Sequence, residues 1–169
     1  IYPLDPLSLQ GLHTIGIHER GGKVATPLFA HPYTKGSGIA GLLDSMPRLL
    51  AADDFRYLVD RILQARALGK PVLWGLGGHV VKCGLAPVLI DLMDRGFATG
   101  FLFNGSTSIH DFEIAIAGQT SEDVEAVLPG GRFGVAEETG REMNLAIAGA
   151  VDCGMGEALG RRLQEIGHP

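Results

Sequence analysis

Residues 72–118, VLWGLGGHVVKCGLAPVLIDLMDRGFATGFLFNGSTSIHDFEIAIAG, decide the predicted fold of this chain. The stretch reads as strand, glycine-rich loop, helix, strand, polar loop and helix, which makes two consecutive βα units. Its first strand, residues 72–76, lacks alternation of polar and apolar residues, which is typical of a strand buried on both faces of a parallel sheet. We therefore predict an α/β fold in which right-handed crossovers place helices on both faces of a parallel sheet.

Glycine, proline and capping residues set the boundaries of the neighbouring elements. We expect one helix to begin at Asp53, as its N-cap, and to end at Gly69. A second helix follows the glycine turn and continues to about Arg95. The next strand covers residues 98–103, and Ser108 is the expected N-cap of the helix after it.

The regions on either side of this core differ in character. Residues 1–50 are rich in Gly, Pro and His, and we expect an irregular part there with candidate short strands at 12–17 and 24–29 and a weak helix over 37–50 that Pro47 breaks. The C-terminal part predicts three helices: a short acidic one capped by Thr120 or Ser121, then 135–150 and 154–166. We expect one domain over residues 1–169, with its βα core and C-terminal helices in 51–169. Two clear strands are few, so we expect chain not present here, or a partner, to complete the sheet.

Composition excludes several classes of protein. Hydrophobic residues make up 46% and charged residues 20% of the 169 residues, which predicts a packed core. The net charge of −5 argues against non-specific nucleic-acid binding, and no apolar run approaches the ~20 residues of a membrane span. Cys83 and Cys153 form no CxxC motif, so we expect a reduced, cytoplasmic location. No HxH or HExxH spacing supports a metal site. The start of the chain lacks both a signal-peptide pattern and a Met, so the chain is either processed or a fragment.

The first candidate site is the glycine loop at the end of the first strand. Gly75, Gly77, Gly78 and His79 are neither a GxGxxG fingerprint nor a Walker loop. Two interpretations remain open: a nucleotide-binding loop whose amides meet phosphate or ribose, or a tight βα turn that needs small residues. Lys82, in the first turn of the helix, could meet a phosphate, form an imine with a carbonyl carbon, or simply be solvated.

The second candidate site follows the second strand. Ligands bind beyond the carboxyl ends of parallel strands, so both loops can line one crevice. His110 and Asp111 point about 100° apart on a helix, so one of them, not both, can face that crevice as a proton carrier or polar clamp. Helix capping and solvation are the alternative. The hydrogen-bonding residues here are Asn104, Gly105, Ser106, Thr107, Ser108, His110, Asp111 and Glu113.

The segment from Gly75 to about Gly134, which contains GLGGHVVKCGL and the loop NGS at 104–106, resembles the deoxyhypusine synthase family. The resemblance implies a Rossmann-like, NAD-dependent transferase that forms a homotetramer with sites at subunit interfaces. Such enzymes oxidise a polyamine and pass its aminobutyl group through a lysine imine to an amine acceptor. The NAD contacts that the resemblance implies are Gly77, Gly78, His79, Val80, Val81 and Lys82 in the first loop and Asn104, Gly105 and Ser106 in the second.

The chain departs from the family pattern where the polyamine would bind. Ile109 and His110 stand at two positions that are acidic in the family, whereas Asp111 matches an acid. A bound dication would lose roughly 1–3 kcal/mol for each lost charged hydrogen bond. The departures from the family pattern therefore weaken the prediction of polyamine specificity more than the prediction of NAD binding. The family's catalytic lysine lies in a later part of the domain, which we expect this chain to lack. GGHVVK also resembles the segment around that lysine, which gives Lys82 a second possible role as the imine-forming residue.

These observations lead to a ranked set of functions. We expect an NAD-binding enzyme that acts on an amine or polyamine-type small molecule by aminoalkyl transfer through an imine, with Lys82, His110 and Asp111 as candidate catalytic residues. We also expect a homo-oligomer, either a dimer or a tetramer. A non-catalytic nucleotide-binding or interaction module of the same fold is the alternative. A third possibility is an unrelated enzyme with His110 as general base, whose pH–rate profile would show a group titrating near ~6.5.

Overall fold

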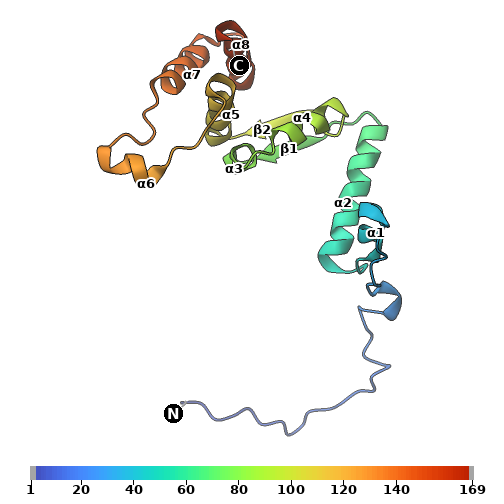
Figure 1. Ribbon diagram of the computed structural model, residues 1–169. Helices are drawn as coiled ribbons and strands as arrows, with labels where there is room; N and C mark the ends of the chain where they lie inside the picture. The colour runs from blue at the N-terminus through green and yellow to red at the C-terminus, as the bar shows by residue number, and fades with distance from the viewer. Residues whose placement is uncertain (1–2, 168–169) are drawn as a thin grey trace. The chain divides into compact units, whose positions relative to one another are not determined.

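The computed structural model describes residues 3–167 and has an α/β architecture. The described residues form eight α-helices and two strands that pair into one parallel sheet (Figure 1). The chain divides into two compact units, residues 1–60 and 61–169, with the boundary inside α2 (Leu50–Ala67). The irregular part that we expected to end at residue 50 therefore belongs to a unit that includes the start of α2.

In the first unit, irregular chain precedes the helical part. The strands predicted at 12–17 and 24–29 are wrong: residues 12–17 form no regular element, and the second segment contains only the 3₁₀ turn η1 (Thr26–Leu28). Apolar side chains in the first segment stay largely exposed, so nothing there supports strand pairing.

The two helices of the first unit meet at the break expected at Pro47. The weak helix is confirmed as α1 (Gly38–Ser45). The guanidinium of Arg56 on α2 donates to the carbonyls of Met46 and Pro47, each at 2.9 Å, and also to that of Leu43. The turn between α1 and α2 is thus held by one side chain.

Helix α2 begins before its expected cap and ends where glycine predicts. Its first residue is Leu50, so Asp53 lies in the first turn, where a carboxylate interacts favourably with the positive end of the helix dipole. Gly69 has a φ of 61° and follows the last turn, which confirms the predicted termination.

The two predicted strands are confirmed as β1 (Leu73–Leu76) and β2 (Gly100–Phe103), which pair in parallel with Leu73 opposite Gly100 and Leu76 opposite Phe103. The prediction that the first strand is buried on both faces is wrong for this chain, because exposed and half-buried residues alternate along β1. The indole nitrogen of Trp74 donates to the carbonyl of Phe97 at 3.0 Å and ties β1 to the chain before β2.

The helix expected between the strands is two helices, α3 (Gly78–Lys82) and α4 (Ala86–Asp94). Gly84, with a φ of 86°, separates them because the left-handed conformation interrupts the helical hydrogen bonds. Pro87 lies in the first turn of α4, where its missing N–H costs nothing.

Helix α5 (Gly105–Ala117) starts earlier than predicted. Its N-cap is Asn104, whose side chain accepts from the Thr107 N–H, and Ser108 lies inside the helix, so the predicted Ser108 cap is wrong. Asp123, not Thr120 or Ser121, caps α6 (Val124–Val127), which runs into the 3₁₀ turn η2 (Leu128–Gly130).

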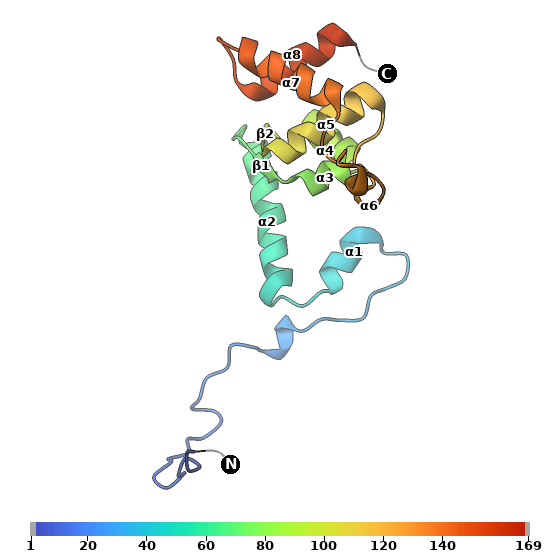
Figure 2. The same cartoon turned by 90° about the vertical axis from the view of Figure 1, so that its left-hand side faces the viewer.

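The predicted C-terminal helices are confirmed as α7 (Glu137–Gly149) and α8 (Met155–Ile166), which lie side by side next to α5 (Figure 2). Each contributes to one small core, in which Phe112, Met143 and Leu159 are buried. Across the α7–α8 contact, the Nε of Arg162 donates to Glu142 Oε2 at 2.9 Å. No helix in the described part of the chain has the length and apolarity that a membrane span requires.

Candidate functional site

The loops after β1 and β2 leave the same edge of the sheet, as the sequence predicts. Because Leu76 pairs with Phe103 in a parallel ladder, both chains emerge side by side. Gly78, the first residue of α3, then packs directly on α5. A Cβ built on Gly78 would lie 2.2 Å from the Ser106 Oγ and 3.1 Å from the His110 Cδ2. The two loops adjoin, but protein atoms fill the space between them.

The first loop therefore works mainly as a packing turn. Gly78 and Val81 are buried, and Gly77, His79 and Val80 do not line the cleft described below. Lys82, at the end of α3, is exposed and does line it. The tight-turn interpretation of the glycines thus has a structural basis at Gly78.

In the second loop, one residue caps α5 and others line the cleft. Asn104 Oδ1 accepts from the N–H and from the hydroxyl of Thr107, each at 3.0 Å, so this oxygen is committed to the helix. Thr107 is fully buried, and its hydroxyl also lies 3.3 Å from the Leu76 carbonyl oxygen. Gly105 and Ser106 open onto the cleft.

The candidate site is a cleft of about 730 Å³ on the α7 side of α5. Its walls are α5, the segment 121–136 and α7, and Lys82 lies at its border with α3. The size is that of a small-molecule site. The larger apolar side chains that line it are Ile109, Val124, Phe133, Met143 and Ile147.

A connected set of polar side chains lies along one wall of the cleft. His110 Nδ1 is 2.8 Å from the Thr120 Oγ1, and that hydroxyl donates to Glu113 Oε2 at 2.5 Å. The hydroxyl of Thr139 on α7 donates to the other carboxylate oxygen, Oε1, at 3.3 Å. Two segments of the chain, helix α7 and the one after α5, therefore converge on the Glu113 carboxylate of α5.

The sequence pattern does not predict that these residues form one hydrogen-bonded set. The spacing of His110 and Glu113, three apart on one helix, does place them on the same face and could have signalled the pair. Thr120 was expected to cap a helix instead. It reaches Glu113 because Gly118, with a φ of 69°, ends α5 and turns the chain back. That turn is a feature of the folded chain that spacing alone does not reveal.

Asp111 does not share the cleft with His110. It lies on an exposed part of α5 and does not line the cleft, in agreement with the expectation that only one of the two residues faces it. Partial burial nevertheless raises the pKa of its carboxyl above the usual range. Of the two candidates, His110 is the one that the structure brings to the cleft.

The charged groups of the cleft are Lys82, Glu113 and Glu122. Glu122 Oε1 accepts from the Gly134 N–H at 2.8 Å, which fixes this carboxylate near the entrance to α7. Two carboxylates among apolar walls suit an organic cation with a hydrocarbon chain, because the walls take the hydrocarbon and the carboxylates take the ammonium group.

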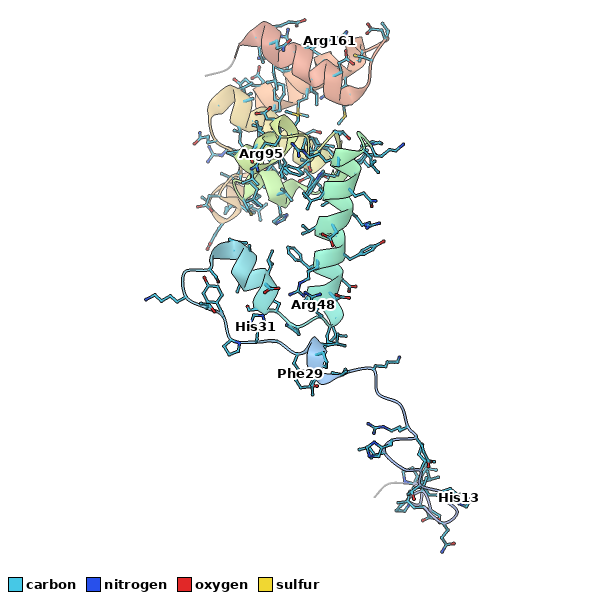
Figure 3. The ribbon with its side chains drawn as sticks, turned by 90° about the vertical axis from the view of Figure 1, so that its right-hand side faces the viewer. His13, Phe29, His31, Arg48, Arg95 and Arg161 are labelled. Carbon is cyan, nitrogen blue, oxygen red and sulfur yellow. The ribbon has the colours of Figure 1, made fainter. Side chains whose placement is uncertain are left out.

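The positions of the histidines and acidic side chains bear on whether the chain can bind a metal ion. Within residues 3–167, no group of three or more His, Cys, Asp or Glu side chains is arranged to hold one. His13 lies on the irregular N-terminal segment, whereas His31 lies near α1, with its Nε2 3.7 Å from Asp44 Oδ2 (Figure 3).

The residues expected to hold NAD fit that cofactor in part. A dinucleotide needs free backbone amides near its phosphates and a close approach of glycine. The close neighbour of Gly78 is the Ser106 side chain, and the side-chain oxygen of Asn104 caps α5. Lys82, Gly105 and Ser106 remain, at the border of the cleft, as an ammonium group and two exposed small residues.

Comparison of the chain with protein-family models, with curated proteins and with solved structures finds no match. The resemblance to the deoxyhypusine synthase family therefore depends on the sequence motifs alone, and the function has to be argued from the cleft.

Proposed function

We propose that this chain is a deoxyhypusine-synthase-like, NAD-binding enzyme whose cleft takes an amine or polyamine-type substrate. The observation that carries the proposal is the pair of carboxylates, Glu113 and Glu122, in an otherwise largely apolar cleft that His110 and Lys82 also line. A charged hydrogen bond to an ammonium group contributes about 1.5–3 kcal/mol, so Glu122 compensates in part for the acids replaced by Ile109 and His110, while Glu113 adds negative charge to the same wall.

The side chains divide the work as follows. Met143 and Ile147 contact the hydrocarbon part of the substrate, and Glu122 binds its ammonium group. His110 accepts a proton from the amine that reacts, because only the neutral amine can lose a hydride from its neighbouring carbon. NAD, when bound, supplies the hydride acceptor. Lys82, Gly105 and Ser106 are the residues that would hold it, at the border of the cleft.

Lys82 also carries the transfer step of the proposal. After oxidation, its neutral Nζ forms a bond to the oxidised carbon, and the bond from that carbon to the departing amine breaks. As the imine forms, Nζ gives up a proton and the departing nitrogen takes one up, and His110 is the candidate residue for both transfers. The aminoalkyl group is then held on Lys82 as an imine, from which an amine acceptor can take it.

Calorimetric titration tests the two binding claims separately. NAD is titrated into the purified protein, and spermidine into a second sample. We expect Glu122→Gln to weaken spermidine binding roughly 10- to 100-fold, as the loss of one charged hydrogen bond predicts. Glu125→Gln is the matched control, because Glu125 carries the same charge on α6 outside the cleft. Absence of NAD binding would contradict the proposed cofactor. Equal effects of the two variants on spermidine binding would contradict the proposed amine site.

Variants of Lys82 test the transfer step. Lys82→Arg keeps the positive charge but cannot form an imine, so it should bind NAD normally and lose aminoalkyl transfer by orders of magnitude. Lys82→Ala should lose both, whereas Lys70→Ala, a lysine that does not line the cleft, should change neither. Transfer that survives in the arginine variant would contradict the imine.

A second candidate, a non-catalytic interaction module, is favoured by the open sheet. Leu73 and Leu102 are each 62% exposed and Phe103 is 43% exposed, and within residues 3–167 no third strand pairs with β1 or β2. A Rossmann-like sheet would be completed by chain outside this sequence or by a second copy in a dimer or tetramer. Light scattering gives the oligomeric state. In a module without chemistry, Lys82→Ala should cost only modest ligand affinity.

A further inference from the structure

We infer that Thr120 and Glu113 form a hydrogen-bonded relay that holds His110 with its proton on Nδ1 and leaves Nε2 as the base that faces the cleft. The relay deepens the proposed function, on which it rests for the identity of the substrate but not for the protonation pattern.

The direction of the hydrogen bonds follows from counting protons. The hydroxyl of Thr120 has one hydrogen, and it goes to Glu113 Oε2 at 2.5 Å, because an ionised carboxylate can only accept. The 2.8 Å contact between this hydroxyl and His110 Nδ1 therefore has to be donated by the imidazole. A neutral His110 then carries its single proton on Nδ1, and the lone pair is on Nε2.

The carboxylate at the end of the relay is fixed from two sides. Its Oε2 accepts from Thr120 and its Oε1 accepts from Thr139 on α7 at 3.3 Å. Glu113, Thr120 and Thr139 are all half-buried, so the relay is shielded in part from water, which strengthens its electrostatic bonds. Glu113 is therefore a positioning residue for His110 rather than a group that needs to touch substrate.

The remaining ring nitrogen is accessible. His110 is half-buried and lines the cleft, and no residue among 3–167 is a hydrogen-bond partner of its Nε2. Among these residues no buried side-chain nitrogen or oxygen lacks a partner, so Nε2 is not buried. The ring edge at Cδ2 lies against Gly78, which limits rotation of the imidazole.

The charged groups that line the cleft around His110 come from α3, from α5 itself and from the segment before α6. Helix α3 contributes Lys82, the segment before α6 contributes Glu122, and the residues of α7 that line the cleft carry no charge. His79 on α3 and Asp111 on α5 lie outside the lining. The local balance is thus two carboxylates against one ammonium group, which favours a cation near the Nε2 lone pair.

Nitrogen NMR of the histidine side chains reads the relay directly, because protonated and bare ring nitrogens have distinct shifts. His110→Gln assigns the signal among the six histidines. At a pH where the ring is neutral, we expect the proton on Nδ1 in the wild-type protein and in Thr120→Ser, which keeps the hydroxyl. In Thr120→Val the Nδ1–H form should lose its dominance. Thr139→Val, which removes only the outer hydrogen bond, should retain it.

The outcomes separate the relay from the proposed function. A wild-type His110 with its proton on Nε2 would overturn the relay, and this measurement needs no variant that might fail to fold. An unchanged tautomer in folded Thr120→Val would overturn it as well. If the tautomer is as expected but no amine is oxidised in the presence of NAD, the relay stands and the proposed function fails. With turnover, His110→Gln should lower kcat by about 10²–10⁴-fold, and Thr120→Val by less.

Discussion

Replacement of Gly78 by alanine tests the contact that joins the two loops. The added Cβ would lie 2.2 Å from Ser106 Oγ, 3.1 Å from Ser106 Cβ and 3.1 Å from His110 Cδ2. Rotation of the Ser106 side chain relieves the first overlap, but the other two require the α3–α5 contact to open by a few tenths of an ångström. Overpacking of this kind costs about 1–3 kcal/mol.

Gly105→Ala is the matched control for that cost. Gly105, like Gly78, is the first residue of a helix that follows a strand, and a Cβ there would have no neighbour within 4 Å. Both substitutions gain a similar 0.4–1 kcal/mol, roughly, because alanine restricts the unfolded chain. The difference between the two variants in the free energy of unfolding, about 1–3 kcal/mol, therefore measures the overlap alone.

The assay is urea denaturation followed by the fluorescence of Trp74, the single tryptophan, which lies on β1 next to these loops. With a slope of roughly 1–3 kcal/mol per molar urea, the midpoints of the two variants should differ by about 1 M. Ser106→Gly should reduce the cost of Gly78→Ala, since it removes the atoms in closest contact. Equal midpoints for both alanine variants, or a cost that is not reduced in the Ser106→Gly background, would refute the packing described here.

Three further predictions concern the stability of the second unit. Asn104→Ala should lose about 1 kcal/mol in urea denaturation, whereas Asn104→Asp should retain the cap; equal losses would contradict the N-cap role. Phe112→Ala should lose about 3–5 kcal/mol, and a loss near zero would mean that the core lies elsewhere. Hydrogen bonds from Arg162 and Arg141 lower the pKa of Glu142, so its stabilising effect is complete above the unfolded value of about 4.5 and is lost as the pH falls through the folded value. Glu142→Gln should therefore flatten the acid side of the stability curve measured by urea midpoints from about pH 6 to pH 3, and an unchanged slope would argue against the ion pair.

The parts of the fold that the sequence predicts well are those set by local chemistry. Gly69, Pro47 and Pro87 lie where the predicted breaks and starts require them, and both core strands pair in parallel as expected. The wrong prediction of Ser108 as the N-cap of α5 also has a local cause. Asn104 and Ser108 are both residue types that cap helices well, and only the loop geometry decides between them. The effect of a glycine inside a helical pattern is ambiguous in the same way. The apolar pattern predicts one continuous helix between the strands, but Gly84 separates α3 from α4.

Tertiary packing decides the rest, above all the position of the site. Sequence spacing predicts a crevice between the loops at Gly78 and Ser106, but glycine at the first position lets the two backbones approach until no room remains. The open volume begins instead at Ser106 and His110 and extends along α5 toward α7, where α7 and the segment 121–136 form walls that no strand-end rule anticipates. A helix presents different residues to its two sides, so this shift selects His110 over Asp111 and brings Glu113 into play. The cleft and its polar side chains therefore lie between α5 and α7, and the loops after β1 and β2 serve chiefly to position α5.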